Sequence, residues 1–346
     1  MTKQLKIALA GAGLIGRRHI EAANEVENVN IVAIVDPKYQ SKEYATSLGV
    51  KHFESLGNML IKEKPDGVIL ATPNLMHVEN GLQCIDAGCP ILVEKPISTS
   101  SRDAETLVKA AKNNNIPVLV GHHRRYNPLI KEAYEIINSG KLGQIRAINS
   151  ICWLYKPDDY FTVAPWRQKI GAGPVSINLA HDIDLLRHLC GDIQSVQSQE
   201  TKSLRGHENE DVAAAVLKFT NGAIGTISVS DTVVSPWSWE LTAKENPIYP
   251  NTKESCYFIG GTHASLSLPD LTLWNNNGVR SWWQELERTT LSFVPSDPLI
   301  NQINHFANVI LNKEKPLVSG EEGLKTLYVI EAMQKSIDTG LVVNLI

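Results

Sequence analysis

The sequence predicts an α/β protein with two domains. Residues 1–122 are expected to form a doubly wound parallel sheet, and residues 123–346 an α+β domain with an open, mainly antiparallel sheet. Two observations lead to this prediction. Over the first ~120 residues, short and nearly continuous apolar runs alternate with helical stretches, as in parallel strands buried on both faces. Beyond Gly121, longer runs follow one another without helices between them, which indicates an antiparallel sheet.

The strands expected in the first domain are short, rich in β-branched residues and bounded by turn residues. They cover residues 5–11, 30–36, 66–72, 90–96 and 116–122. Helical segments separate them. One of these is 101–115, where Ser101 is the expected N-cap and a run of asparagines ends the helix.

The second domain is expected to begin with a helix and to continue into a sheet. Asn221-Gly222 joins two runs in a hairpin pattern. The remaining strands and helices complete an α+β domain that is expected to face the first across a cleft. The expected strands are 145–155, 211–220, 223–233, 255–261, 264–270 and 288–294, and the expected helices are 128–140, 174–190, 298–312 and 320–339.

Composition and charge indicate a globular protein. The 346 residues are 43% hydrophobic and 20% charged, with a net charge of −4 and a pI of about 6.2. This balance offers no basic surface for nucleic acid. The chain has no apolar run of the ~20 residues that cross a bilayer, and its N-terminus leads straight into a Gly-rich turn. We therefore expect a cytoplasmic protein without nucleic-acid or membrane partners.

The cysteines and histidines indicate neither a disulfide framework nor a metal site. The chain has 5 cysteines, an odd number, without a C-x-x-C pair, and we interpret them as reduced core residues. Its 10 histidines are scattered, and the adjacent pair His122 and His123 has no partner at a metal-binding spacing. No metal is expected.

A Gly-rich turn follows the first expected strand. In the segment GAGLIG, Gly11, Gly13 and Gly16 give G-x-G-x-x-G, with Leu14 and Ile15 opening a helix. Glycines here allow a tight turn, and backbone N–H groups at the helix start bind a pyrophosphate. Asp36 ends the next strand, where a carboxylate accepts hydrogen bonds from an adenosine ribose. The pattern predicts dinucleotide binding, against the alternative of a plain strand–helix turn.

Asp36 also bears on the choice between the two nicotinamide dinucleotides. Its carboxylate repels a 2′-phosphate, which favours NAD over NADP. Lys38 and Lys42 lie close by in the sequence and weaken that preference. We predict NAD as the cofactor, with NADP as the less favoured alternative.

Six segments along the chain carry a family resemblance. They are GAGLIGRRH, ATPNLMH at 71–77, EKP at 94–96, GHHRRYNP at 121–128, APWR at 164–167 and GAGPVSINLAHDIDLLRHLCG at 171–191. Together they resemble the Gfo/Idh/MocA family of NAD(P)-dependent oxidoreductases. The resemblance covers almost the whole chain. It implies a Rossmann domain followed by an open-faced α+β domain, with a sugar, inositol or related polyol as substrate.

The resemblance also implies roles for individual residues. Lys95 and His181 are implied as catalytic groups, and the substrate is implied to contact Arg124, Tyr155, Asn178 and Asp182. Besides the Gly-rich turn and Asp36, the implied cofactor contacts are Thr72, Pro73, Asn74, His77, Glu94, Lys95, Trp166 and Arg167. Alternative interpretations are a solvated strand end for Lys95, an ordinary turn for residues 72–74, and core packing for Trp166 and His181.

One departure from the family pattern concerns the segment before His181. Family members often carry G-G-G-x-x-x-D-x-G-x-H, and counting back from His181 places Ile177 at the Asp position. Asn178 lies three residues before His181, on the same helix face. Because an amide forms hydrogen bonds but carries no titratable proton, proton transfer is expected to rest on His181 or Lys95.

Three functions are compatible with these features. The first is an NAD-dependent dehydrogenase or ketone reductase acting on CH–OH groups of a polyhydroxylated substrate. The second is a non-redox sugar enzyme of the same fold that uses NAD in elimination or hydrolysis, and the third is a non-catalytic sugar or nucleotide sensor. Retention of Lys95 and His181 favours the first. The open sheet also predicts a homodimer or homotetramer formed through its uncovered face.

Overall fold

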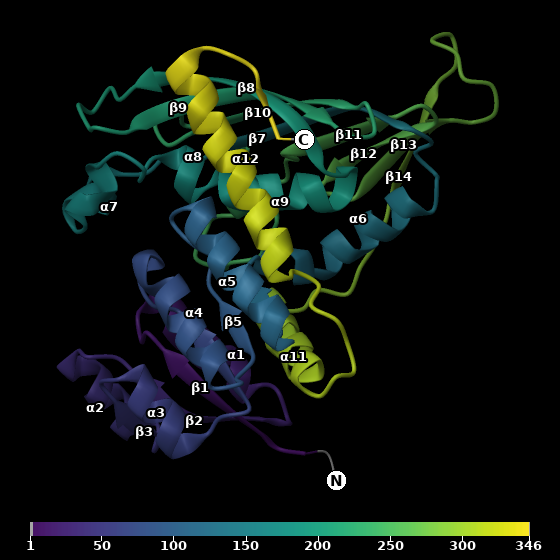
Figure 1. Cartoon of the computed structure of the whole chain (residues 1–346). Helices are drawn as coiled ribbons and strands as arrows, with labels where there is room; N and C mark the ends of the chain where they lie inside the picture. The colour runs from purple at the N-terminus through teal and green to yellow at the C-terminus, as the bar shows by residue number, and fades with distance from the viewer. Residues whose placement is uncertain (1–2, 346) are drawn as a thin grey trace. The chain divides into compact units, whose positions relative to one another are not determined.

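The computed structural model describes residues 3–345 (Figure 1). The chain divides into two compact units. The first takes in the chain up to Asn127 together with Ser296–Leu327, and the second takes in Pro128–Pro295 and the chain from Tyr328 onward. Among residues 3–345, no helix has the length and apolar character needed to cross a membrane.

The first unit is built on a six-stranded sheet with the order β3-β2-β1-β4-β5-β6. All of its pairings are parallel, which confirms the predicted Rossmann sheet. The apolar residues of its central strands are buried because helices cover both faces. The strands are β1 (Leu5–Ala10), β2 (Val29–Val35), β3 (Lys51–Phe53), β4 (Gly67–Leu70), β5 (Ile91–Val93) and β6 (Val118–Val120).

The helices between these strands follow the alternation seen in the sequence. They are α1 (Leu14–Asn24), α2 (Tyr39–Ser47), α3 (Leu56–Glu63), α4 (His77–Asp86) and α5 (Ser101–Asn114), with the 3₁₀ turns η1 (Asn74–Met76) and η2 (His123–Tyr126). The N-cap of α5 is Ser100, whose hydroxyl accepts from the N–H of Asp103, instead of the expected Ser101. This one-residue shift follows from the capping geometry.

A helix from late in the chain also packs in the first unit. α11 (Pro298–Ile310) contributes Leu299, Ile303 and Phe306 to the same buried cluster as β1 and β4. A Cβ on Gly67 of β4 would lie only 2.9 Å from the ring of Phe306 and 2.7 Å from the end of Ile310. This close packing places residues 296–327 in the first unit, whereas the sequence-based division assigned them to the second domain. The boundary between residues 122 and 123 stays a prediction.

The second unit is built on a nine-stranded sheet with the order β14-β13-β12-β11-β7-β10-β9-β8-β15. Its pairings are antiparallel except between β7 and β10, which confirms an open, mainly antiparallel sheet. The strands are β7 (Ile145–Trp153), β8 (Ile193–Lys202), β9 (Glu210–Phe219), β10 (Ile224–Ser230), β11 (Tyr257–Gly261), β12 (Ala264–Leu268), β13 (Thr272–Asn276), β14 (Leu286–Thr290) and β15 (Val343–Asn344).

The helices of the second unit cover one face of this sheet. Figure 1 shows α6 and α9 lying along it, and their apolar residues form one buried cluster with the inward-facing residues of the strands. The helices are α6 (Pro128–Asn138), α7 (Asp158–Thr162), α8 (Pro174–Ile177), α9 (Leu179–Cys190) and α10 (Trp239–Thr242), with the 3₁₀ turn η3 (Pro165–Gln168). α12 (Gly320–Thr339) runs from the first unit into the second.

Several elements differ from the sequence-based expectation. The helix expected at 174–190 is divided into α8 and α9, with Asn178 at the join. The strand expected at 288–294 is β14, which ends at Thr290. β8 and β13 were not expected, because their polar, exposed residues hide the alternation that marks a half-buried strand.

Candidate functional site

The Gly-rich turn leaves room for a ligand at its middle glycine. Gly11 has φ +90°, and a Cβ there would lie 2.3 Å from the carbonyl oxygen of Ala71; a Cβ on Gly16 would lie 2.0 Å from that of Gly11. Protein packing therefore requires both of these glycines. A Cβ on Gly13 would meet no protein atom within 4 Å, so packing does not explain this glycine. Close approach of a pyrophosphate explains it, and the turn fits the predicted dinucleotide.

Asp36 is fixed next to this turn. One carboxylate oxygen accepts a hydrogen bond from the N–H of Ala12 at 2.9 Å, and the other accepts from the N–H of Lys38 at 2.9 Å. Each oxygen of an ionised carboxylate has a second lone-pair direction, so Asp36 retains the capacity to accept from a ribose hydroxyl. The side chain of Lys38 is exposed beside it.

Two adjoining hollows surround these residues. One, of about 400 Å³, is lined by the Gly-rich turn, Asp36 and the residues after β4, including Thr72 and Pro73. The other, of about 610 Å³, shares Gly13, Asp36 and Lys38 with the first and extends over Leu14. The two hollows form one depression at the carboxyl ends of β1, β2 and β4. Of the residues predicted for the nucleotide site, it is lined by Gly11, Gly13, Leu14, Asp36, Thr72 and Pro73.

The loop after β4 is tied down by His77. Its ring nitrogens lie 2.9 Å from the carbonyl oxygen of Thr72 and 2.8 Å from that of Pro96. The ring is fully buried, so His77 holds two loops together and does not itself line the depression. Pro73 and Asn74 are exposed on the same loop.

Glu94 and Lys95 follow β5 at the same edge of the sheet. Glu94 is buried; its Oε1 lies 2.7 Å from Nε2 of His19, and its Oε2 accepts from the N–H of Lys95 at 3.1 Å. The peptide bond between Lys95 and Pro96 is cis. Lys95 itself is half-buried, at the end of a buried strand.

In the second unit, Glu210 fixes the start of the helix pair that carries His181. Its Oε1 accepts a hydrogen bond from the N–H of Val175 at 2.9 Å, in the first turn of α8. A Cβ on Gly173 would lie 2.1 Å from this carboxylate, so only glycine fits there. Burial raises the pKa of Glu210, although its backbone hydrogen bonds oppose that shift. Gly173 of the GAGP segment therefore serves the helix start.

Three predicted site residues lie where α8 passes into α9. Asn178 stands at the join, and the N–H of His181 donates to its carbonyl oxygen at 3.2 Å. Both side chains are largely buried, with 9% and 8% exposed. Asp182 is fully buried and accepts a hydrogen bond from the hydroxyl of Tyr257 on β11, which anchors α9 to the sheet.

Sequence reasoning missed a buried lysine beside this helix pair. Nζ of Lys156 donates to Oδ1 of Asn178 at 2.8 Å and lies 3.7 Å from Oδ2 of Asp231. Only 7% of Lys156 is exposed. A signal was present, because Lys156 follows an apolar strand and precedes a proline, as Lys95 does.

The remaining predicted residues are distributed over both units. Arg124 is buried in η2 of the first unit. Tyr155 is exposed in the second, and Trp166 is 60% exposed on η3. The guanidinium of Arg167 lies over the ring of Tyr160, 3.9 Å from its centroid, and donates to the carbonyl oxygen of Tyr160 at 2.7 Å.

Residues 3–345 contain no group of three or more His, Cys, Asp or Glu side chains that would hold a metal ion. All five cysteines are buried as thiols. Burial raises the pKa of Cys84, Cys89 and Cys190, which favours the protonated thiol.

Two family models match consecutive parts of the chain. The model described as the oxidoreductase family with an NAD-binding Rossmann fold matches residues 5–122. The GFO/IDH/MocA C-terminal domain matches residues 130–266. Between them they include the Gly-rich turn, Lys95, Asn178 and His181, so the NAD-binding domain predicted from the sequence is confirmed.

Known relatives and solved structures agree with these matches. A 4-carboxy-2-hydroxymuconate-6-semialdehyde dehydrogenase from a Sphingobium species is 30% identical over 65% of this chain and 72% of its own. The myo-inositol 2-dehydrogenase of Thermotoga maritima is 23% identical over 96% of each chain. The structure of scyllo-inositol dehydrogenase from Lactobacillus casei, with NAD(H) and scyllo-inositol, superposes with a TM-score of 0.79 at 19% identity, over 99% of each chain.

The matches extend over both halves of the chain and include a relative that aligns over most of its own length. The fold and the Gly-rich turn agree with them. We therefore conclude that this chain is an oxidoreductase of the Gfo/Idh/MocA family with an NAD-binding Rossmann domain.

Proposed function

We propose that this protein is an NAD-dependent dehydrogenase or reductase acting on a secondary hydroxyl, or the corresponding ketone, of a sugar, inositol or related polyol. The observation that carries the proposal is the position of Lys95. The Gly-rich turn, Asp36, Thr72 and Lys95 follow β1, β2, β4 and β5, which are neighbours in one parallel sheet. Ligands of such sheets bind at the carboxyl ends of the strands.

Side chains of the protein are proposed to accept the proton of the substrate hydroxyl. The residues that line the depression would hold NAD, which would supply the acceptor for the hydride from the carbon that carries the hydroxyl. The proton of that hydroxyl passes to the Lys95 amine or to the His181 imidazole, each of which accepts a proton when neutral. Neither transfer requires the carboxylate that Ile177 replaces. Tyr155, Asn178 and Arg124 are proposed to contact the substrate, and Asp182 to act by holding α9.

The cofactor contacts are proposed on the same grounds. We propose that the nucleotide is bound by the predicted residues that line the depression, namely Gly11, Gly13, Leu14, Asp36, Thr72 and Pro73. Further proposed contacts are Ile15, Gly16, Asn74, Trp166 and Arg167. His77 and Glu94 are proposed to act by positioning, since their side chains hold the loop after β4 and the backbone of Lys95.

The substrate class rests on the relatives. The myo-inositol 2-dehydrogenase aligned over nearly its whole length favours a polyol, and the semialdehyde dehydrogenase is consistent with an oxygenated small molecule. Both relatives are dehydrogenases, which supports a reaction with net oxidation of the substrate. It speaks against a reaction in which NAD is regenerated within each turnover.

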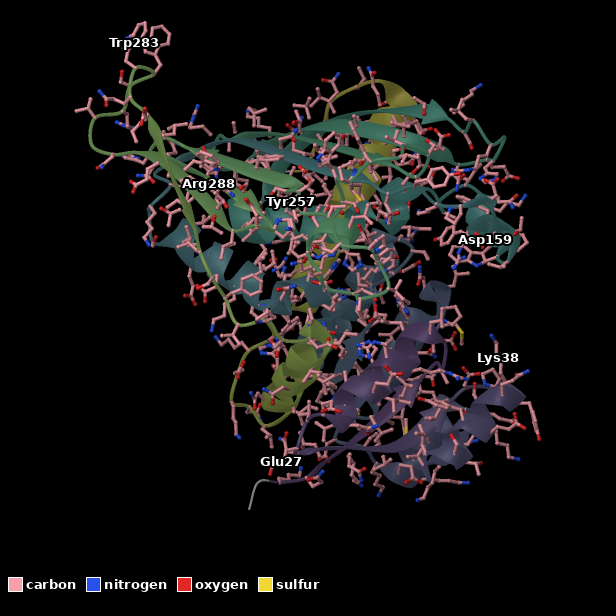
Figure 2. The ribbon with its side chains drawn as sticks, turned by 180° about the vertical axis from the view of Figure 1, so that it is seen from behind. Glu27, Lys38, Asp159, Tyr257, Trp283 and Arg288 are labelled. Carbon is pink, nitrogen blue, oxygen red and sulfur yellow. The ribbon has the colours of Figure 1, made fainter. Side chains whose placement is uncertain are left out.

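We further propose a homodimer or homotetramer assembled through the open face of the nine-stranded sheet. Outward-facing Val216, Ile224, Phe258 and Trp274 leave apolar surface there, around a hollow of about 780 Å³. The hairpin of β13 and β14 adds Trp282 and Trp283, 89% and 84% exposed, and Figure 2 shows Trp283 at its outer end. Exposed large apolar side chains gathered on one sheet face are typical of a protein interface.

The function is tested with a panel of inositols, aldoses, other polyols and glycosides. Each is incubated with NAD and the purified protein, and reduced nicotinamide is followed by absorbance. We expect turnover with at least one inositol or sugar. Product formed without net change in NADH would instead identify the non-redox reaction, and a panel with no conversion at all would contradict the proposal.

A further inference from the structure

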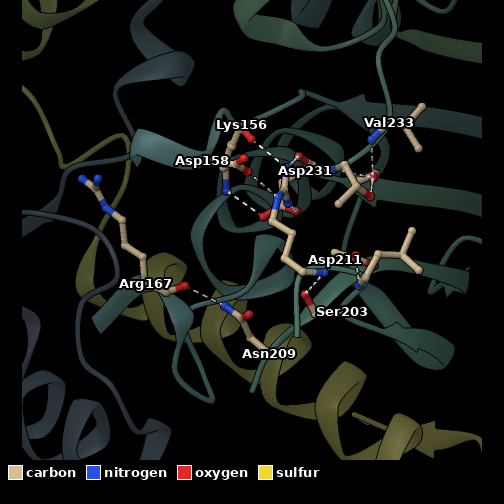
Figure 3. Close-up of polar contacts among 12 residues, drawn as sticks. Lys156, Asp158, Arg167, Ser203, Asn209, Asp211, Asp231 and Val233 are labelled. Carbon is tan, nitrogen blue, oxygen red and sulfur yellow. Dashed lines mark hydrogen bonds and ion pairs between the residues drawn. The ribbon is translucent and has the colours of Figure 1, made fainter. Parts of the chain in front are cut away.

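Lys156 is held in the second unit by a buried polar network (Figure 3). Its N–H donates to the carbonyl oxygen of Asp231 at 2.9 Å, and its own carbonyl accepts from Arg205 at 2.7 Å. Arg205 also donates to Oδ1 of Asp231 at 3.0 Å. Lys156 therefore has a fixed backbone and a fixed partner carboxylate.

The end of the Lys156 side chain faces several charged groups. Burial lowers the pKa of Lys156, and the negative charges of Asp231, Glu240 and Glu210 oppose that shift. The ring of Tyr160 lies 5.3 Å from Nζ. A buried ammonium group requires hydrogen-bond acceptors, and Oδ1 of Asn178 is the acceptor at hydrogen-bond distance.

This contact determines how Asn178 can act. A protonated lysine only donates, so the atom of the amide that faces Lys156 is the oxygen. The NH₂ group of Asn178 is then left for other partners. A donated hydrogen bond at the oxygen also polarises the amide, which strengthens its N–H groups as donors.

We propose that Lys156 is a positioning residue for the oxidoreductase reaction, which fixes the orientation of Asn178 so that its NH₂ group acts on the substrate as a hydrogen-bond donor. The inference rests on the proposed function. The NH₂ group of Asn178 is then assigned to a substrate oxygen that accepts a hydrogen bond. That atom is a keto or carboxylate oxygen, or the oxygen that gains negative charge as the hydroxyl proton leaves. A carboxylate in place of Asn178 would instead select a donating hydroxyl.

The test compares Lys156→Met, Asn178→Ala and the double variant on the best substrate of the panel. Met keeps the stem of the side chain, and Arg205 remains as the partner of Asp231, so the variant is expected to fold. We expect each single variant to reduce kcat/KM about 10-fold to 100-fold, the range for a hydrogen bond to a charged group. The double variant is expected to lose little more than Asn178→Ala, because the two residues act as a unit.

Two further variants separate this role from a merely structural one. Asn178→Asp restores an acid but removes the donor, and we expect activity to fall at least as far as in Asn178→Ala. Lys131→Met, an exposed lysine on α6, is the control and should leave activity unchanged. Additive losses in the double variant, or higher activity in Asn178→Asp, would overturn the proposal.

A spectroscopic measurement tests the contact without any substrate. Protein labelled with ¹⁵N-asparagine gives the side-chain amide signal of Asn178, identified by its loss in Asn178→Ala. We expect this signal to shift in Lys156→Met and to stay in place in Lys131→Met. An unchanged signal in Lys156→Met would overturn the inference even where the dehydrogenase activity is found, and a shift would support it even where the panel shows no turnover.

Discussion

Oε1 of Glu94 lies 2.7 Å from Nε2 of His19, and both side chains are buried in the first unit. Burial alone would raise the pKa of Glu94. The hydrogen bond from His19 and the electrostatic interactions with His19, His123 and Lys95 outweigh it, so the pKa of Glu94 is below its ordinary value. The glutamate next to the proposed catalytic lysine is therefore held as a carboxylate, and it fixes the backbone N–H of Lys95.

This pair predicts a pH dependence of stability. Because the pKa of Glu94 is lowered in the folded state, its contribution is fully present above the ordinary value of 4.5 and is lost as the pH falls through the folded-state value. Glu94→Gln should lower the free energy of unfolding at neutral pH by about 1–3 kcal/mol. As the pH falls below 4.5, the free energy of unfolding of Glu94→Gln should decrease less steeply than that of the parent protein. Denaturant unfolding across the acid range measures both, and parallel curves would contradict the argument.

The middle glycine of the turn gives a prediction about cofactor binding. Gly13→Ala adds a methyl group that meets no protein atom, so the melting temperature should hardly change. Affinity for NADH should fall at least ~10-fold, because the methyl group occupies the space where the backbone approaches the pyrophosphate. Gly57→Ala on α3, whose added Cβ meets only ordinary contacts, is the control for both measurements. Unaltered NADH affinity in Gly13→Ala would place the pyrophosphate elsewhere.

Asp36 predicts the cofactor preference. Calorimetric titration should show tighter binding of NADH than of NADPH, because the carboxylate repels a 2′-phosphate. Asp36→Ser should reduce the difference between the affinities for NADH and NADPH. In that variant the exposed Lys38 is available to pair with the 2′-phosphate of NADPH. Equal affinities in the parent protein, or tighter NADPH, would contradict the role given to Asp36.

The open sheet face predicts the state of assembly. Light scattering coupled to size exclusion should give the mass of a dimer or tetramer at micromolar concentration. Phe258→Arg places a charge on that face and should shift the mass toward the monomer, whereas Ile61→Arg, at an exposed apolar position on α3, should not. A monomer mass for the parent protein would show that the face does not mediate self-association.

The parts of the site that the sequence could predict depend on neighbours along the chain. Gly11, Gly13 and Gly16 fall within one turn, and Asp36 ends the adjacent strand, so spacing alone indicates their joint role. The parallel sheet was predictable for the same reason, since each buried strand shows as a continuous apolar run. The structure bears out the parallel sheet.

What spacing could not predict are contacts between distant segments. Lys156 and Asn178 are 22 residues apart, and His19 and Glu94 are 75 apart. Such pairs form only when helices and strands pack. The pattern around each residue does not show them, which is why the lysine was missed. The addition of α11 to the first unit has the same origin, since it depends on Gly67 accommodating Phe306 and Ile310.

The most direct test of the central claim separates cofactor binding from turnover in Lys95→Ala. Lys95 follows β5 and is not among the residues that line the nucleotide depression, so calorimetry should show nearly unchanged NADH affinity. Turnover on the best substrate should fall ~10²–10⁴-fold, as expected for the loss of a positioned acid or base. His181→Ala, measured beside it, should behave likewise. Unimpaired turnover in both variants would contradict the mechanism, and a loss of NADH affinity in Lys95→Ala would assign that lysine to the cofactor site instead.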